Sequence, residues 1–223
     1  MLKIVSQDHS AFTDRYEAGA FLAIELGQLK GKQAVVLGIP RGGVVIAAQI
    51  AERLRDARLD IILSRKLRAP SSPELAVGSI SENGQIYLNR HLIQQLGISS
   101  DYIQQESEFQ FDELKRRARV YREVIPRIPL NNRLVIIADD GIATGATFEA
   151  ALNSVRQECP AYLIAALPVG PESTLKRLEH LADEVICLKC PEEFESVGQY
   201  YCYFTQVDDA DVLNTLKRFR HIV

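Results

Sequence analysis

The chain alternates short apolar runs with longer amphipathic segments. Five runs have the length and continuity of buried strands, at residues 34–39, 59–63, 134–138, 162–167 and 184–188. Helical spacing of apolar residues is found at residues 12–29, 44–54, 101–124, 147–159 and 172–181. The apolar positions of the first predicted helix are Phe12, Tyr16, Ala20, Ala23, Ile24 and Leu26. Strands that alternate with helices form parallel sheets, so the pattern predicts an α/β fold with a parallel sheet flanked by helices on both faces.

Two further segments lie outside this alternation. Residues 64–72 are basic and interrupted by proline, which predicts a loop. Residues 77–88 alternate on either side of Glu82-Asn83-Gly84, which predicts a hairpin with a tight turn. No internal repeat or linker divides the sequence, so we expect residues 1–223 to form a single domain.

Two carboxylates end the apolar run at residues 134–138. Asp139 and Asp140 come directly after it, and a segment of small and hydroxyl-bearing residues leads into the next predicted helix. Free backbone N–H groups at a helix start suit a phosphate, and glycines let the backbone approach a ligand closely. Carboxylates instead accept hydrogen bonds from sugar hydroxyls or hold Mg²⁺ through water. The pattern indicates a sugar-phosphate site; the alternative is an ordinary turn in which one aspartate caps the helix.

This string of residues resembles a known signature. Asp139-Asp140-x-x-x-Thr144-Gly145-x-Thr147 after a hydrophobic strand is similar to the signature that binds 5-phosphoribosyl 1-pyrophosphate (PRPP) in type I phosphoribosyltransferases. The resemblance implies the type I phosphoribosyltransferase fold, with catalytic Asp139 and Asp140 that contact the ribose and, through PRPP or water, Mg²⁺. It also implies that the 5′-phosphate is bound by Gly141, Ile142, Ala143, Thr144, Gly145, Ala146 and Thr147.

Cationic segments follow two other predicted strands at the same edge of the sheet. In Pro40-Arg41-Gly42-Gly43 the glycines let backbone N–H groups face an anion, and Arg41 adds a bidentate contact. Arg65 and Lys66 open a cluster of three cations within four residues. The resemblance implies that Arg41, Gly42, Arg65 and Lys66 bind pyrophosphate, that Arg65 and Lys66 assist catalysis, and that residues 65–89 form a flexible flap. The alternatives are a plain glycine turn and a solvated basic loop.

A small hood near the termini is the remaining part that the resemblance implies. It comprises about residues 189–223 together with the N-terminal segment, and Phe194, Val197 and Tyr200 are its candidates for binding a planar acceptor. The aromatic residues would equally serve to pack the C-terminal segment on the body. Ala143 stands where the 6-oxopurine branch of the family has an aspartate, which disfavours hypoxanthine or guanine as the acceptor.

Composition and charge narrow the range of partners. The 223 residues carry a net charge of −3, which gives no electrostatic case for nucleic-acid binding, and we interpret the basic patch at residues 115–119 as a solvated helix face. No apolar run approaches the ~20 residues of a membrane span and the N-terminus lacks a signal-peptide pattern, so we expect a cytoplasmic protein without membrane partners. Cys187 and Cys190 form a C-x-x-C without a second pair, which favours buried apolar cysteines over a metal or redox site.

Over most of its length the chain resembles a group of uncharacterised predicted bacterial phosphoribosyltransferases. The resemblance implies a Mg²⁺-dependent transferase that moves the 5-phosphoribosyl group of PRPP to an unidentified nucleobase or other nitrogen acceptor and releases pyrophosphate. A PRPP-binding regulatory protein without turnover is the alternative, and a different phosphosugar enzyme is a third hypothesis. Dimers are common in the resembling family, so a homodimer is expected by analogy.

Overall fold

A six-stranded parallel sheet forms the centre of the molecule. The computed structural model describes residues 1–70 and 72–220. The sheet has the strand order β1-β9-β8-β7-β2-β3, and each neighbouring pair is parallel. Its strands are β1 (Leu2–Ser6), β2 (Val35–Gly38), β3 (Arg58–Ile61), β7 (Leu134–Ala138), β8 (Tyr162–Val169) and β9 (Glu184–Lys189). The predicted α/β fold with a parallel sheet is confirmed, and β7 has the predicted bounds.

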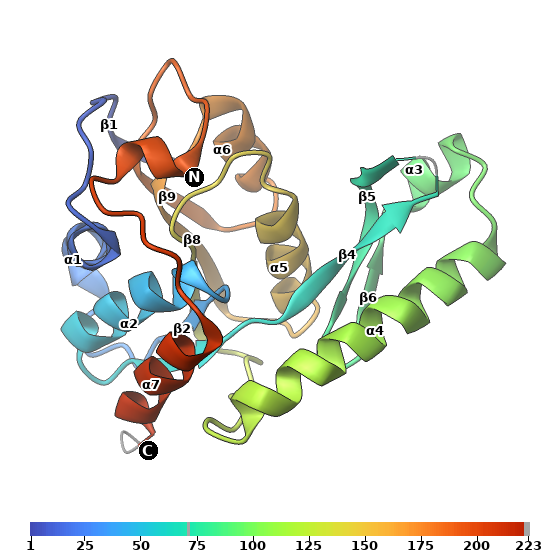
Figure 1. Cartoon of the computed structure of the whole chain (residues 1–223), viewed down its shortest axis with the longest axis horizontal. Helices are drawn as coiled ribbons and strands as arrows, with labels where there is room; N and C mark the ends of the chain where they lie inside the picture. Colours follow the sequence, from blue (N-terminus) through green and yellow to red (C-terminus); the bar gives the residue numbers. More distant parts are fainter. Residues whose placement is uncertain (71, 221–223) are drawn as a thin grey trace.

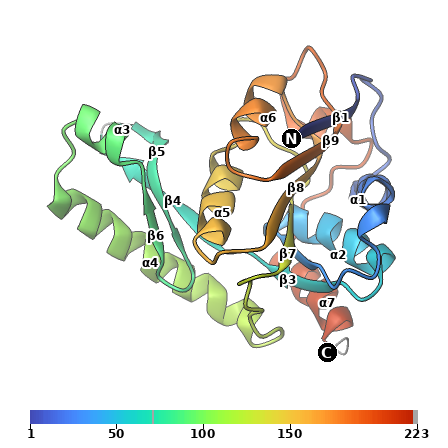
Figure 2. The same ribbon diagram turned by 180° about the vertical axis from the view of Figure 1, so that it is seen from behind.

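Helices cover both faces of this sheet, as predicted (Figure 1, Figure 2). The body contains α1 (Arg15–Glu25), η1 (Gly27–Leu29), α2 (Gly42–Leu54), α5 (Ala146–Arg156), α6 (Glu172–Leu178), η2 (Val197–Tyr200) and α7 (Asp209–Phe219). Ile136 and Ala138 of β7 pack in one buried cluster with α1 and α2, whereas Val135 and Ile137 pack in the other with α5 and α6. Alternate residues of the strand thus build a hydrophobic layer on each face. Within the described residues, no helix is both long and apolar enough to cross a lipid bilayer.

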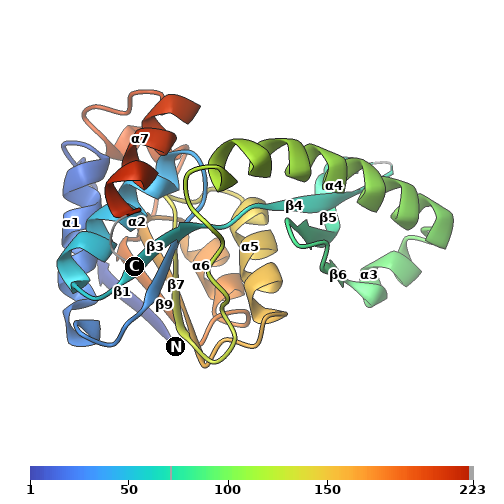
Figure 3. The ribbon, with the colours of Figure 1, turned by 90° about the horizontal axis from the view of Figure 1, so that it is seen from below.

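The middle of the chain forms an arm that extends from the body (Figure 1, Figure 3). The arm comprises β4 (Ser64–Ala69), β5 (Ser72–Ser81), β6 (Ile86–Leu88), α3 (Arg90–Gln95) and α4 (Ser100–Arg122). Antiparallel pairing of β5 with β6 confirms the predicted hairpin at residues 77–88. The predicted loop at residues 64–72 is wrong, because residues 64–69 form a strand that pairs with β5; residue 71 lies outside the described residues.

Two of the cationic side chains of strand β4 bind side chains of α4. Arg68 Nε lies 2.7 Å from Glu106 Oε1, and Arg65 Nε donates to Gln110 Oε1 at 2.5 Å. Leu67 between the two arginines is fully buried. The partners lie 38 and 45 residues further along the chain, so the local pattern of residues 64–72 does not contain the signal for a strand.

A buried ion network fixes the base of the arm to the body. Arg122, the last residue of α4, donates to Asp60 of β3 and to Glu82 in the turn between β5 and β6. Asp60 is 1% exposed, and its second oxygen accepts the backbone N–H of Ile128 at 2.8 Å. The hairpin turn is therefore held against the body, while flexibility of residues 65–89 stays a prediction.

The N-terminal segment differs from its prediction. Residues 2–6 form β1, an edge strand whose alternating exposure gives a weak pattern. Helix α1 begins at Arg15 and is capped by the Asp14 side chain. The predicted apolar face is wrong at Tyr16 and Ile24, which are exposed, whereas its members Phe12, Ala23 and Leu26 are buried. The buried stripe of α1 also includes Arg15.

Candidate functional site

Two loops meet at the carboxyl edge of the central sheet. β2 and β7 are parallel neighbours, and their last residues, Gly38 and Ala138, face each other in register. The N–H group of Ile39 donates to the carbonyl of Ala138 at 3.0 Å, which holds the starts of the two loops together. The 40–43 loop, whose two glycines form the start of α2, and the 139–147 loop, whose last two residues form the start of α5, therefore begin side by side. Ligand-binding loops of parallel sheets have this arrangement.

Contact between these loops is close enough to require glycine. A Cβ atom on Gly42 would overlap the carboxylate of Asp140. A Cβ atom on Gly43 would lie 2.8 Å from Oδ1 of Asp139. The 40–43 loop, which has a cis peptide bond between Pro40 and Arg41, thus packs its backbone on both carboxylates that the sequence singled out.

Asp140 is held by groups that come from the two ends of the chain. Its carboxylate accepts a hydrogen bond from Arg15 Nε at 2.7 Å, and its backbone carbonyl accepts one from the hydroxyl of Tyr201 at 2.7 Å. Burial raises the pKa of the Tyr201 phenol, and the nearby Asp140 charge raises it further, so this hydroxyl remains a donor. The orientation of Asp140 is therefore set by the first helix and by the hood segment together.

Asp139 has the more perturbed electrostatic environment of the two. Its Oδ1 accepts the backbone N–H of Asp140 at 2.9 Å. Burial raises its pKa well above the ordinary value of 3.8, and the adjacent Asp140 charge adds to this, whereas Arg15 opposes it. Two neighbouring carboxylates with a single arginine beside them favour a ligand that brings hydroxyl donors or positive charge.

The 139–147 loop is supported from behind by α6. Thr174 Oγ1 donates to the carbonyl of Ala143 at 2.8 Å, and Arg177 donates to the carbonyl of Thr144 at 2.5 Å. Gly145, the residue before α5, has a left-handed backbone with φ of +82°. With its carbonyls bound on the α6 side, the loop leads into a helix start whose first N–H groups have no intrahelical acceptor.

The hood segment reaches this loop through Val197. A Cβ atom on Gly141 would lie 2.6 Å from Val197 Cγ1, so the predicted acceptor residue Val197 packs directly on the loop. Phe194 and Tyr200 instead stack on each other, with ring centroids 5.7 Å apart. Tyr200 is 2% exposed and donates its hydroxyl to the carbonyl of Glu193, so in this structure it has the packing role that was the alternative for these aromatic residues.

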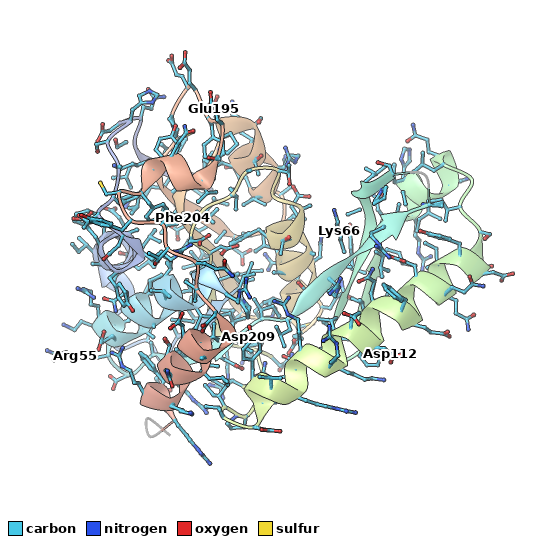
Figure 4. The ribbon with its side chains drawn as sticks, in the orientation of Figure 1. Arg55, Lys66, Asp112, Glu195, Phe204 and Asp209 are labelled. Atoms are coloured by element: carbon cyan, nitrogen blue, oxygen red, sulfur yellow. The ribbon has the colours of Figure 1, made fainter. Side chains whose placement is uncertain are left out.

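Arg65 and Lys66 lie on the arm and not on a loop at the sheet edge. Strand β4 turns Arg65 toward Gln110 of α4, as described above. Successive side chains of a strand point to opposite faces. Figure 4 shows Lys66 on the side of β4 that faces α5. The structure therefore separates the two cations that the sequence treated as one cluster.

The remaining sequence candidates, the two cysteines and the basic patch, lie outside the two loops. Cys187 and Cys190 are buried in the cluster beneath α5 and α6, as predicted. Among the described residues, no group of three or more His, Cys, Asp or Glu side chains is gathered to bind a metal directly. Lys115 and Arg116 of the basic patch are exposed and pair with acids one turn earlier on α4, which agrees with a solvated face.

Sequence reasoning missed Arg15. Its side chain is 9% exposed and reaches Asp140 across 125 residues of sequence. The signal that was available is its position, because Arg15 stands three, four and seven residues before Ala18, Gly19 and Leu22, which form the buried stripe of α1. A charged residue within such a stripe requires a buried partner.

Comparison with known proteins shows the family of the chain. A family model described as the phosphoribosyl transferase domain matches residues 10–205. A Mycobacterium tuberculosis H37Rv protein, provisionally named a phosphoribosyl transferase, is 44% identical over 93% of this chain and 46% of that protein. The chain thus spans about half the length of the curated relatives it matches. The crystal structure of TT1426 from Thermus thermophilus is 42% identical, with a TM-score of 0.88 over 94% of this chain and 99% of that chain. AQ2163 from Aquifex aeolicus, 16% identical with a TM-score of 0.53 over 89% and 91%, shares the fold.

Proposed function

Because the chain belongs to the phosphoribosyl transferase domain family, we propose that it binds PRPP and transfers the 5-phosphoribosyl group to a nitrogen acceptor. The bond from ribose C1 to pyrophosphate breaks, with its electron pair leaving on pyrophosphate, and the acceptor nitrogen forms the new bond and loses its proton. The observation that carries the proposal is the meeting of a glycine-containing cationic loop and a two-carboxylate loop at neighbouring strand ends.

The 139–147 loop would hold the phosphoribosyl part of PRPP. Its 5′-phosphate would lie against the backbone of residues 141–147, supported by the free N–H groups and the dipole at the start of α5. Asp139 and Asp140 would accept hydrogen bonds from the ribose hydroxyls. This division of roles matches the two chemistries of the loop, because carboxylates repel a phosphate and accept from hydroxyls.

The 40–43 loop would hold the pyrophosphate. Backbone groups of Gly42 and Gly43 lie against the carboxylates, so a pyrophosphate bound there would lie next to ribose C1. Arg41 would neutralise charge that develops on the leaving group. Mg²⁺ suits the hard oxygen donors of Asp139 and Asp140 through water, and when bound it would add positive charge to the pyrophosphate.

The hood would supply the acceptor site. Val197 supports this assignment because it packs on Gly141 of the phosphoribosyl loop. Ala143 provides neither an acid nor a base, so the proposed acceptor is one whose proton goes to water and not to this position. The chemical class that we propose for the acceptor is a compound with a nucleophilic nitrogen.

Calorimetric titration with PRPP and Mg²⁺ tests the proposal. The wild type should bind, and Asp139→Asn/Asp140→Asn should abolish binding while keeping the fold. A matched control, Asp101→Asn/Glu108→Gln, removes two exposed carboxylates of α4 and should leave the dissociation constant unchanged. A folded wild type that does not bind PRPP would refute the proposal. Binding without pyrophosphate release, across a panel of nucleobases, would instead identify a PRPP-binding regulatory protein.

A further inference from the structure

A single buried arginine joins three separate segments of the site. Arg15 Nε donates to Asp140 Oδ2 at 2.7 Å, and its Nη1 donates to the carbonyl of Thr205 at 2.8 Å. Its guanidinium carbon lies 3.9 Å from the centroid of the Phe204 ring. These contacts link α1, the carboxylate loop and the hood, and Figure 4 shows Phe204 on the hood segment near the body.

The backbone of Arg15 is fixed by the core, so the guanidinium has little freedom. It is the first helical residue of α1, and Ala18 and Leu22 on the same stripe are fully buried. The Asp140 carboxylate is confined in turn, because Oδ2, the oxygen that accepts from Arg15, also lies against the backbone of Gly42, where a Cβ atom would overlap it. A planar fork that stacks on an aromatic ring and donates in two directions is a geometry that lysine does not reproduce.

We propose that Arg15 is the positioning residue of the site. It holds the Asp140 carboxylate against the 40–43 loop, and it joins the hood to the 139–147 loop. This inference rests on the proposed function, since it concerns the same PRPP site. In this proposal Arg15 acts without contacting PRPP itself. Its effect on PRPP passes through Asp140, and its effect on the acceptor passes through the Thr205 carbonyl and the Phe204 ring.

A double-mutant cycle on PRPP binding separates this role from a general effect on stability. Calorimetry would compare the wild type, Arg15→Gln, Asp140→Asn and the double variant, each with PRPP and Mg²⁺. We expect Arg15→Gln to raise the dissociation constant about tenfold or more, and the double variant to bind within about twofold of Asp140→Asn alone. Non-additivity of this kind arises when one residue acts through the other.

Arg156 offers a matched control. It also pairs with a carboxylate, Asp183 at 3.2 Å, and with a backbone carbonyl, that of Leu181 at 3.0 Å, but at the far end of α5. Arg156→Gln should therefore leave PRPP binding within about twofold of wild type. Arg15→Lys should bind nearly as weakly as Arg15→Gln, and it keeps the cycle measurable if Arg15→Gln does not fold. For Arg15→Ala, about 10 mM guanidinium ion, far below denaturing concentrations, should restore part of the affinity.

The outcomes distinguish the two levels of the argument. A folded wild type without PRPP binding overturns the proposed function and this inference together. Binding by the wild type with independent, multiplying effects of the Arg15 and Asp140 substitutions overturns the inference alone. Full affinity in Arg15→Lys, or equal losses in Arg15→Gln and Arg156→Gln, would also overturn it, because either result means that the fork geometry at Asp140 has no special part in binding.

Discussion

Replacing Arg122 by methionine should lower the free energy of unfolding by about 3–5 kcal/mol at neutral pH, the usual cost of removing one partner from a buried ion pair. The structure supports a loss of this size. Arg122 Nε donates to Glu82 Oε2 at 2.8 Å, a second nitrogen donates to the carbonyl of Ile61 at 3.2 Å, and a third pairs with Asp60. The side chains of Asp60 and Glu82 are only 1% and 6% exposed, so both would remain as buried carboxylates without this cation.

The pH dependence of this loss identifies its cause. Burial raises the pKa of Asp60 above 3.8, and the Arg122 charge opposes the rise. A raised folded-state pKa means that the folded protein favours the protonated form of Asp60. The stabilisation that comes from this protonated form is therefore fully present below pH 3.8, and it is lost as the pH rises through the folded-state pKa. Without Arg122 the pKa rises further. The deficit of Arg122→Met should therefore be largest at about pH 7.5 and shrink toward about pH 5.

Urea unfolding followed by circular dichroism measures the deficit at both pH values. Methionine has a similar length and flexible packing, so a cavity is not the expected cause of the loss. Arg116→Met is the control, because Arg116 pairs with Glu113 on the exposed face of the same helix and should show no measurable change. A loss below about 1 kcal/mol for Arg122→Met, or one that grows as pH falls, would refute the argument.

Two other expectations follow from local geometry. Gly145→Ala should lower the free energy of unfolding by about 1–3 kcal/mol and weaken PRPP binding, because a non-glycine residue at φ +82° is strained and its Cβ would lie 2.6 Å from Thr174 Cγ2. Gly97→Ala is the control, because φ is +62° there and the added Cβ would meet no atom within 4 Å. It should lower the free energy of unfolding by less in the same assay. In the native protein, maleimide should label the exposed Cys159 and Cys202, and the buried Cys187 and Cys190 should react only after urea is added; mass spectrometry measures the labelling. Burial also raises the pKa of Cys187, so rapid labelling of this thiol in the native protein would contradict its position beneath α5.

The parts of the fold that sequence predicts are those in which neighbours along the chain share one environment. Every residue of β7 after Leu134 is fully buried, so an unbroken apolar run reveals the strand and its bounds. β1 is an edge strand with alternating exposure, and its five residues give little contrast with a loop. Strand β4 is hidden for a different reason, since the acid and amide that accept from its arginines belong to α4.

The same distinction holds in the site. The two carboxylates and the glycines of the 139–147 loop are adjacent in sequence, so their chemistry can be recognised together. Arg15 contributes from 125 residues away, and sequence alone does not pair it with Asp140. Conversely, Arg65 and Lys66 are adjacent in sequence, which predicts one pyrophosphate site, but consecutive residues of a strand face opposite sides.

This separation leads to a prediction about the leaving group. Arg65 donates to Gln110 of α4, whereas Lys66 lies on the face of β4 toward α5, so of the two only Lys66 is on the side of the body (Figure 4). If the arm contributes a cation to pyrophosphate, Lys66→Gln should weaken pyrophosphate binding about tenfold or more, the worth of one charge-assisted contact. Arg65→Gln removes the same charge one residue earlier and should change it by less than about threefold. Calorimetry with pyrophosphate and Mg²⁺ measures both. Equal losses would mean that the cations act through their summed charge, and a larger loss for Arg65→Gln would mean that the arm moves when the ligand binds.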